Sequence, residues 1–148
     1  MPYNHRTYVE TFAKEHSLAF HAATHWDDLL SYSHILRDTR EATLIADFDE
    51  ASQFVTTDDD SIFTRTTYNV FCFTPAEVGN ISTAPEAQHQ AREILDEFVR
   101  TLLRDAHTGA AGLRHLDRSS VEINTMGMLG DWSFGVSVSY TIINPFCY

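Results

Sequence analysis

The segment from Asp131 to Ile142 constrains the fold more than any other part of this chain, because its hydrophobic and small polar side chains strictly alternate. A period of two residues predicts a β-strand with one buried face. At about 3.4 Å per residue this strand would be roughly 40 Å long, whereas typical strands span ~17–20 Å. We therefore predict a strand that bends or reaches past its own sheet, as a scaffold and an assembly surface. The two alternating sets are Trp132, Phe134, Val136, Val138, Tyr140 and Ile142, and Ser133, Gly135, Ser137, Ser139 and Thr141.

Two helices are predicted upstream of this strand. Asn4 is a suitable N-cap for a helix from about His5 to His16, whose hydrophobic residues recur at helical spacing. Pro85 and Glu86 are typical of the first turn of a second helix, which Ser82 or Thr83 would cap. This helix should end near His107, with Gly109 beyond it. Its hydrophobic stripe consists of Ile94, Leu95, Phe98, Val99, Leu102 and Leu103.

Strands account for most of the remaining sequence. Ala42–Val55 and Ile62–Thr74 read as two strands of a hairpin around the polar turn Thr56–Ser61. The run VFCF in the second of them predicts a strand that is central or covered on both faces. A further strand should start at Val121, and MGMLGD should form a turn before the last strand. Leu18–Thr24 fits a short strand or a connector, and Asp27–Arg37 is ambiguous.

This order predicts an α+β fold, with an antiparallel sheet of four or more strands and two main helices packed on one face. A length of 148 residues fits one domain spanning the chain. Two cysteines, Cys72 and Cys147, lie in apolar stretches and suit packing in a reducing compartment better than a disulfide framework. The longest apolar runs are too short to cross a membrane, so we expect no membrane association.

Charge is the second strong constraint. The formal net charge is −11, and Lys14 is the single lysine among ten basic residues. This balance argues against binding to a phosphate backbone, which requires clustered Lys and Arg. Acidic residues concentrate between residues 41 and 60, without an intervening Lys or Arg, and we interpret this stretch as a solvated hairpin with an acidic tip. The acids singled out as assembly or channel-facing candidates are Asp47, Asp49, Asp58, Asp59 and Asp60.

Catalytic and metal-binding patterns are weak, so we predict a protein that is not an enzyme and has no cofactor. His21 and His25 have the i, i+4 spacing of metal ligands, but the zincin glutamate is missing between them and helical periodicity is poor. We interpret them as surface or packing histidines. Cys72 lies in an apolar strand, where a thiol stays protonated and inert. Asp47 and Asp49 could pair as carboxylates, yet the sequence shows no desolvating pocket beside them.

Two further residues are candidates for assembly. Trp132 is either a core residue or an interface anchor, since Trp is enriched at interface hot spots. The apolar ending IINPFCY places Phe146 after Asn144–Pro145, where strand pairing should stop. A tail this apolar must be covered by its own domain or by a partner.

The helix AQHQAREILDEFVRTLLRD and the closing hairpin SSVEIN…GDWSFGVSVSYTI, after an N-terminal helix and an acidic hairpin, together resemble tail-terminator and head–tail connector proteins of long-tailed bacteriophages and prophages. The resemblance lies in element order over most of the chain. It implies a virion protein, made in the host cytoplasm, that forms a ring, usually a hexamer, beside tail-tube and neck proteins. DNA would pass through this ring without specific binding, past an acidic lining.

Two other classes of function stay open. A small ligand-binding or enzymatic α+β domain could enclose a pocket between its sheet and its helices. An acidic interaction or inhibitor module could mimic nucleic acid, although such proteins spread their acids over a whole face, whereas here they concentrate in one hairpin.

Overall fold

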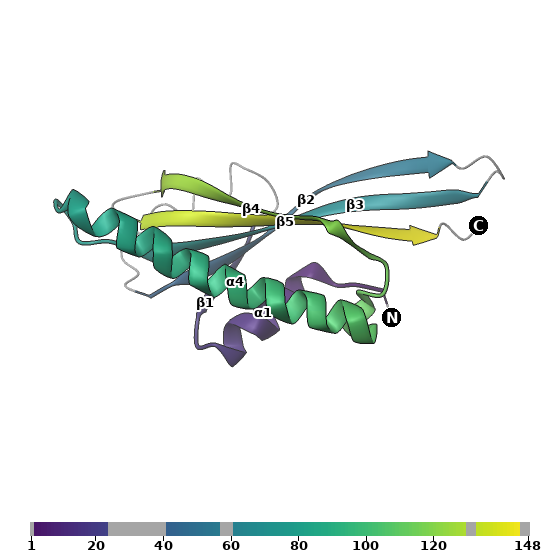
Figure 1. Cartoon of the computed structure of the whole chain (residues 1–148), viewed down its shortest axis with the longest axis horizontal. Coiled ribbons are helices and arrows are strands. Elements are labelled where there is room, and N and C mark those ends of the chain that lie inside the picture. The colour runs from purple at the N-terminus through teal and green to yellow at the C-terminus, as the bar shows by residue number, and fades with distance from the viewer. Residues whose placement is uncertain (1, 24–40, 57–60, 130–132, 146–148) are drawn as a thin grey trace.

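A computed structural model describes residues 2–23, 41–56, 61–129 and 133–145 of the chain. Within these ranges one five-stranded sheet has the order β1-β2-β3-β5-β4, and helices α1 and α4 pack on one of its faces (Figure 1). The predicted α+β fold is confirmed. The main elements are α1 (His5–Glu15), β1 (Ala19–Ala23), β2 (Thr43–Thr56), β3 (Ile62–Pro75), α4 (Ala84–Thr108), β4 (Leu116–Leu129) and β5 (Ser133–Pro145).

Helix α1 forms where the sequence predicts it. The Asn4 side chain accepts a hydrogen bond from the Thr7 backbone N–H at 3.0 Å, which satisfies a donor that the first turn leaves open. Val9, Phe12 and Ala13 are buried on one side of the helix. This buried side packs α1 against β1 and β2.

Helix α4 runs along the long axis of the molecule (Figure 1). It begins at Ala84, but Thr83 does not cap it through its side chain, because the Thr83 hydroxyl donates to Asn80 O and accepts from Glu77 N in the preceding turn. Gly109 ends the helix with φ 74°, a left-handed conformation that favours glycine. The helix buries Ala87, Ala91, Leu95, Phe98, Leu102 and Ala106 against the sheet.

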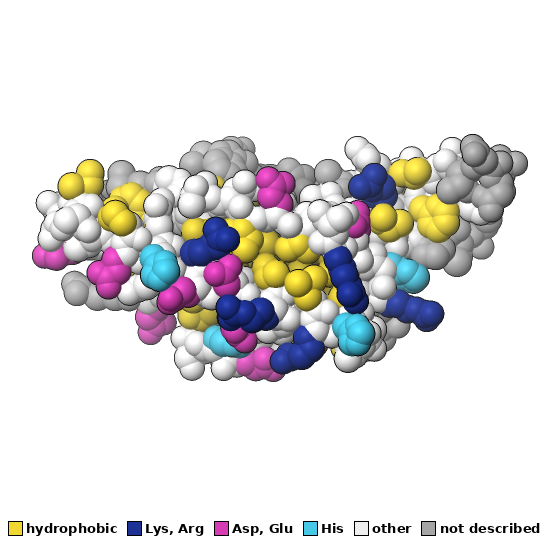
Figure 2. All heavy atoms as spheres, in the orientation of Figure 1, with side chains coloured by type: hydrophobic (Ala, Val, Ile, Leu, Met, Phe, Trp, Pro, Cys, Tyr) yellow, Lys and Arg dark blue, Asp and Glu magenta, His cyan; other side chains and the backbone are white. Residues whose placement is uncertain are grey.

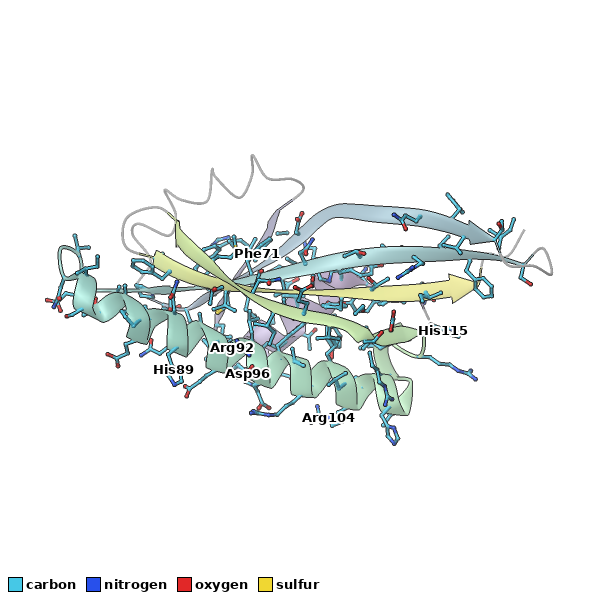
Figure 3. All side chains as sticks on the ribbon, turned by 45° about the horizontal axis from the view of Figure 1, so that its top comes forward. Phe71, His89, Arg92, Asp96, Arg104 and His115 are labelled. Atoms are coloured by element: carbon cyan, nitrogen blue, oxygen red, sulfur yellow. The ribbon has the colours of Figure 1, made fainter. Side chains whose placement is uncertain are left out.

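The sheet is antiparallel except at one edge, where β1 runs parallel to β2. The predicted hairpin of β2 and β3 is confirmed. Strand β3 lies between β2 and β5 and buries Phe71, Cys72 and Phe73, which confirms a strand covered on both faces. Every second residue of β3 from Tyr68 to Cys72 packs with the helices in the hydrophobic core. Phe71, between them in sequence, lies on the opposite face of the sheet, away from α4 (Figure 3).

Two boundaries differ from the prediction. Strand β4 begins at Leu116 instead of Val121. Leu116 and Asp117 already pair with β5, and a bulge then interrupts the pairing until Glu122. The segment predicted as a turn from Met126 is still strand up to Leu129, since Gly127 lies in a second bulge, between Met126 and Met128. Glycine suits a bulge as well as a turn, which explains the error.

Candidate assembly surface

One end of the sheet extends past the helical layer. Figure 1 shows β2 and β3 reaching well beyond the C-terminal end of α4, with the end of β5 beside β3. We call this region, residues 52–56, 62–65 and 143–144, the projecting end. Strand β5 pairs with β3 up to Pro145, so the long carboxy-terminal strand extends past the helices but stays within its own sheet over the described residues.

Hydrophobic side chains occupy both faces of the projecting end. The register places Phe54 opposite Thr64 on the face that continues the helix-covered side, and Phe54 is 68% exposed. Val55 lies opposite Phe63 on the other face and is 37% exposed. Ile143 shares that second face and is half-buried. Figure 2 shows hydrophobic side chains at this end of the molecule. These exposed apolar side chains make the projecting end a candidate contact surface.

The small polar residues of β5, which we predicted to form an assembly surface, are partly buried inside the molecule. Strand β5 lies between β3 and β4, so both of its edges are paired. Ser133 and Thr141 are buried, and Thr141 Oγ1 lies 3.1 Å from Thr67 Oγ1 on β3. Gly135 is covered by the Phe73 ring. Ser133, Gly135 and Thr141 therefore allow close packing inside the molecule, whereas Ser137 and Ser139 are half-exposed.

Most residues singled out for assembly lie outside the described residues. Asp47 is described: it is half-buried on β2, where it pairs in register with Asn69 of β3. The backbone of Asp49 belongs to the β2 bulge between Asp47 and Ala51, but its side chain is not described. The candidates outside the described ranges are Asp58, Asp59, Asp60, Trp132 and Phe146.

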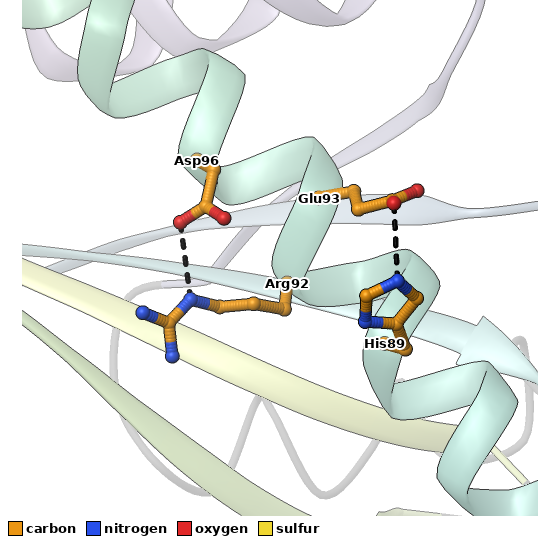
Figure 4. Close-up of polar contacts among 4 residues, drawn as sticks. All are labelled: His89, Arg92, Glu93 and Asp96. Carbon is orange, nitrogen blue, oxygen red and sulfur yellow. Dashed lines mark hydrogen bonds and ion pairs between the residues drawn. The ribbon is translucent and has the colours of Figure 1, made fainter.

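Charged groups on the exposed side of α4 are paired with one another. Arg92 Nε donates to Asp96 Oδ1 at 3.0 Å, and His89 Nε2 lies 3.1 Å from Glu93 Oε1 (Figure 4). Both pairs have i, i+4 spacing on the helix surface, where an exposed ion pair such as Arg92–Asp96 contributes about 0.3–0.5 kcal/mol. This arrangement is typical of a solvated helix face.

His5 is a buried titratable group whose burial the sequence did not reveal. Its Nε2 lies 2.8 Å from the backbone oxygen of Asn69, so this nitrogen carries the proton and Nδ1 is an acceptor. The Tyr3 and Tyr140 hydroxyls lie 2.9 and 3.1 Å from Nδ1 and 2.5 Å from each other. Burial lowers the pKa of His5 to about 4, although the hydrogen bond to Asn69 opposes this shift.

These groups form a closed internal network. Burial raises the pKa of Tyr140, and the pKa of Tyr3 is raised by burial and by Tyr140. Tyr8 donates to Asp105 at 2.7 Å and joins α1 to α4. Among the described side chains, every buried nitrogen and oxygen has a hydrogen-bond partner. The network holds α1 against the sheet through buried hydrogen bonds and is part of the protein core.

The remaining sequence candidates are placed as follows. Cys72 is buried, and burial raises its pKa to about 12, so the thiol stays protonated at neutral pH. His21 is half-buried on β1 and burial lowers its pKa, whereas His25 lies outside the described residues. Within the described ranges, no group of three or more His, Cys, Asp or Glu is arranged to hold a metal ion.

A groove of about 410 Å³ opens between α1, α4 and the sheet. Phe12, Leu18 and Ile94 line it together with two glutamates of α4, Glu93 and Glu97. Its volume falls in the range of small-molecule sites.

None of the helices in the described ranges is long and apolar enough to cross a membrane. Scanned against protein-family models and searched against curated proteins, the chain matches none of them.

Proposed function

We propose that this chain is a structural subunit that assembles with copies of itself into a ring, as a tail terminator or head–tail connector in the neck of a long-tailed phage or prophage. The observation that carries the proposal is the projecting end, which exposes Phe54 and Val55 on opposite faces beyond the helical layer. Packing against the neighbouring subunit would bury these faces.

A ring requires contacts that are heterologous, so that each copy offers two different surfaces and the rotation closes. The projecting end supplies one surface. A hydrophobic strip, visible between α4 and β4 in Figure 2, supplies a second one. Val99 and Leu103 of α4 and Ile123 of β4 are half-buried hydrophobic residues of these two elements. The two surfaces lie on different parts of the molecule, as a heterologous contact needs.

The acidic composition fits a channel. With a net charge of −11 and acids concentrated in residues 41–60, the subunit would repel a phosphate backbone at contact distance. In this proposal Asp47, Asp49 and Asp58–Asp60 face the channel, so that DNA slides past without specific binding. The neighbours would be tail-tube and neck proteins, and the site of action the virion.

Negative-stain electron microscopy of the purified full-length protein tests this function. The proposal predicts rings with a central channel and six-fold views. Isolated particles of the size of one chain, at every protein concentration, would refute it.

A second candidate function is favoured by the groove between α1 and α4. Its apolar lining with Glu93 and Glu97 suits a small hydrophobic amine. Thermal shift measurements with a series of alkylamines test this: stabilisation that disappears in Ile94→Trp, which fills the groove, supports a ligand site, and the absence of any shift rejects it.

A further inference from the structure

Three exposed arginines lie around the C-terminal end of α4, although the chain as a whole is acidic. Arg104 is near the end of the helix, and Arg114 and Arg118 lie on either side of the first residues of β4. A Cβ atom at Gly109, where α4 ends, would lie 4.0 Å from the Cβ of Arg114. We call Arg104, Arg114 and Arg118 the basic surface. Figure 2 shows Lys and Arg side chains around this end of α4.

The guanidinium groups of the basic surface have few partners inside the molecule. Over the described parts of the chain, neither Arg114 nor Arg118 forms an ion pair. Arg104 lies 3.8 Å from the carboxylate of its sequence neighbour, Asp105. Clustered cations without intramolecular partners create a local positive potential, which attracts an acidic surface.

The basic surface borders the projecting end. Leu116 pairs in register with Ile142, and the N–H of Ile143 donates to the backbone oxygen of His115 at 3.0 Å. Residues 143–144 belong to the projecting end, so β4 begins directly beside it. A molecule that packs on the base of the projecting end therefore comes close to the arginines.

The first half of α4 has the opposite charge. Residues 84–97 contain four acids and one arginine, and Figure 2 shows Asp and Glu side chains over this half of the helix. Two of the acids, Asp96 and Glu97, bind arginines of the same helix. The other two, Glu86 and Glu93, are exposed, and His89, which lies beside Glu93, is charged only when protonated.

The helix dipole does not account for this separation of charge. The dipole favours acids in the first turn of a helix and bases in the last turn, and its effect is lost beyond these turns. Glu93 lies beyond the first turn of α4, and Arg114 and Arg118 lie outside the helix. The two charged surfaces therefore call for a partner outside the subunit.

We propose that the basic surface of one copy contacts the acidic first half of α4 in the next copy, and that this match sets the direction of the contact. The inference rests on the proposed ring and deepens it by naming the charged groups that orient neighbouring copies. Hydrophobic and charged groups agree in direction, because the projecting end and the basic surface share one end of the molecule, whereas the hydrophobic strip runs beside α4.

Charge favours a second copy of this chain as the occupant. At a net charge of −11, two copies repel each other in most orientations. The orientation that brings the basic surface of one copy onto Glu86 and Glu93 of the next replaces this repulsion by attraction at the contact. Complementary charges of this kind select the orientation of a complex, and like charges placed opposite each other cost several kcal/mol.

Charge-reversal variants of the full-length protein test the inference by sedimentation velocity. Arg114→Glu with Arg118→Glu reverses the basic surface, and Glu86→Lys with Glu93→Lys reverses the acidic one. Each double variant alone should associate at least about tenfold more weakly than the wild type. Melting temperatures should stay close to wild type, since all four side chains are exposed.

A matched control changes the net charge elsewhere. Arg6→Glu with Lys14→Glu makes the same change in net charge as the arginine double variant, at two exposed residues of α1. This control should associate almost as strongly as the wild type. In 1 M NaCl, where the Debye length is about 3 Å, the losses of the two reversed variants should become smaller.

An equimolar mixture of the two reversed variants tests whether the two surfaces meet. In an alternating assembly, each copy then presents opposite charge to its neighbours on both sides. The mixture should therefore recover association close to that of the wild type, in assemblies of more than two chains.

Three results would overturn the inference. If the wild type associates and the reversed variants associate equally well, the ring stands and the charge match is wrong, whereas a wild type that never associates rejects the ring as well. A mixture that does not recover would assign the arginines to another acidic partner. Recovery limited to a species of two chains would indicate a two-fold contact instead of a directional one.

Discussion

The ring of Phe73 covers Gly135, its directly opposite partner on the neighbouring strand β5. A Cβ atom at Gly135 would lie 2.5 Å from Cε1 of Phe73 and 3.1 Å from the backbone oxygen of Cys72. Glycine is therefore required in the middle of a strand, a position that it otherwise weakens. The aromatic ring replaces the missing side chain and shields the backbone from water.

Substitution Gly135→Ala should reduce the free energy of unfolding by about 1–3 kcal/mol, because the buried Phe73 ring has to move. Urea denaturation at neutral pH measures this change. The control is Gly127→Ala, since a Cβ at Gly127 meets no atom within 4 Å, and we expect little change there. Equal effects at the two glycines would contradict the account.

A double-mutant cycle isolates the contact itself. If Gly135→Ala is harmful because of the Phe73 ring, it should cost much less in a Phe73→Leu background. We expect a coupling free energy within the range of about 0.5–3 kcal/mol seen for residues in contact. Strict additivity would assign the damage to backbone strain instead.

Acid should destabilise the protein through His5. Its folded-state pKa is about 4 against 6.5 for the exposed imidazole, so between these values the unfolded chain binds a proton that the folded chain does not. Stability contributed by the neutral, buried imidazole is complete above pH 6.5 and is lost as pH falls toward 4. The loss should be roughly 3 kcal/mol across this window.

Comparison with His5→Gln separates this effect from other titrations. Glutamine keeps a donor for the Asn69 oxygen but does not titrate. The variant should be less stable than the wild type at pH 7, and the difference should narrow as pH approaches 4. A difference that is independent of pH would show that His5 is not buried in its neutral form.

The Cys72 thiol should be unreactive in the folded protein, because burial raises its pKa to about 12. A Cys147→Ser variant leaves it as the single thiol. We expect Ellman's reagent to modify this variant slowly under native conditions and rapidly in urea. Rapid modification without urea would contradict the burial of β3.

The projecting end should control assembly but not folding. Val55 is exposed on its outer face, and Val55→Asp should leave the melting temperature within a few degrees of wild type while weakening self-association at least about tenfold. Ile81→Asp is a matched control, since Ile81 is 77% exposed but lies on the turn before α4. If both variants self-associate equally strongly, the projecting end does not take part in assembly.

Periodicity made much of this fold predictable. The alternation around Val136 and Val138 and the helical stripe around Leu95 and Phe98 depend on local geometry, and these four residues are buried as predicted. Three other residues of the predicted stripe, Ile94, Val99 and Leu103, are half-buried. On the predicted polar face of β5, Ser133 and Thr141 are buried as well. Helix ends followed from Asn4 and Gly109 for the same reason, because caps act within one turn.

Long-range pairing was not predictable in this way. Strand β1 pairs in parallel with β2, and nothing within AFHAA indicates this partner. The start of β4 at Leu116 was missed because DRSS resembles a loop, yet the Ser120 hydroxyl accepts from Thr141 N at 2.8 Å and so replaces a ladder bond inside the bulge. Burial of His5 depends on Tyr140, which is distant in sequence. For the assembly surface, the sequence indicated the long strand but not which edge stays open.

Sedimentation velocity of the full-length protein over a range of concentrations tests the central claim most directly. The account predicts a closed assembly, with six copies of the 16.8 kDa chain as the expected ring. A single species with the mass of one chain, unchanged up to the highest concentration reached, would contradict it.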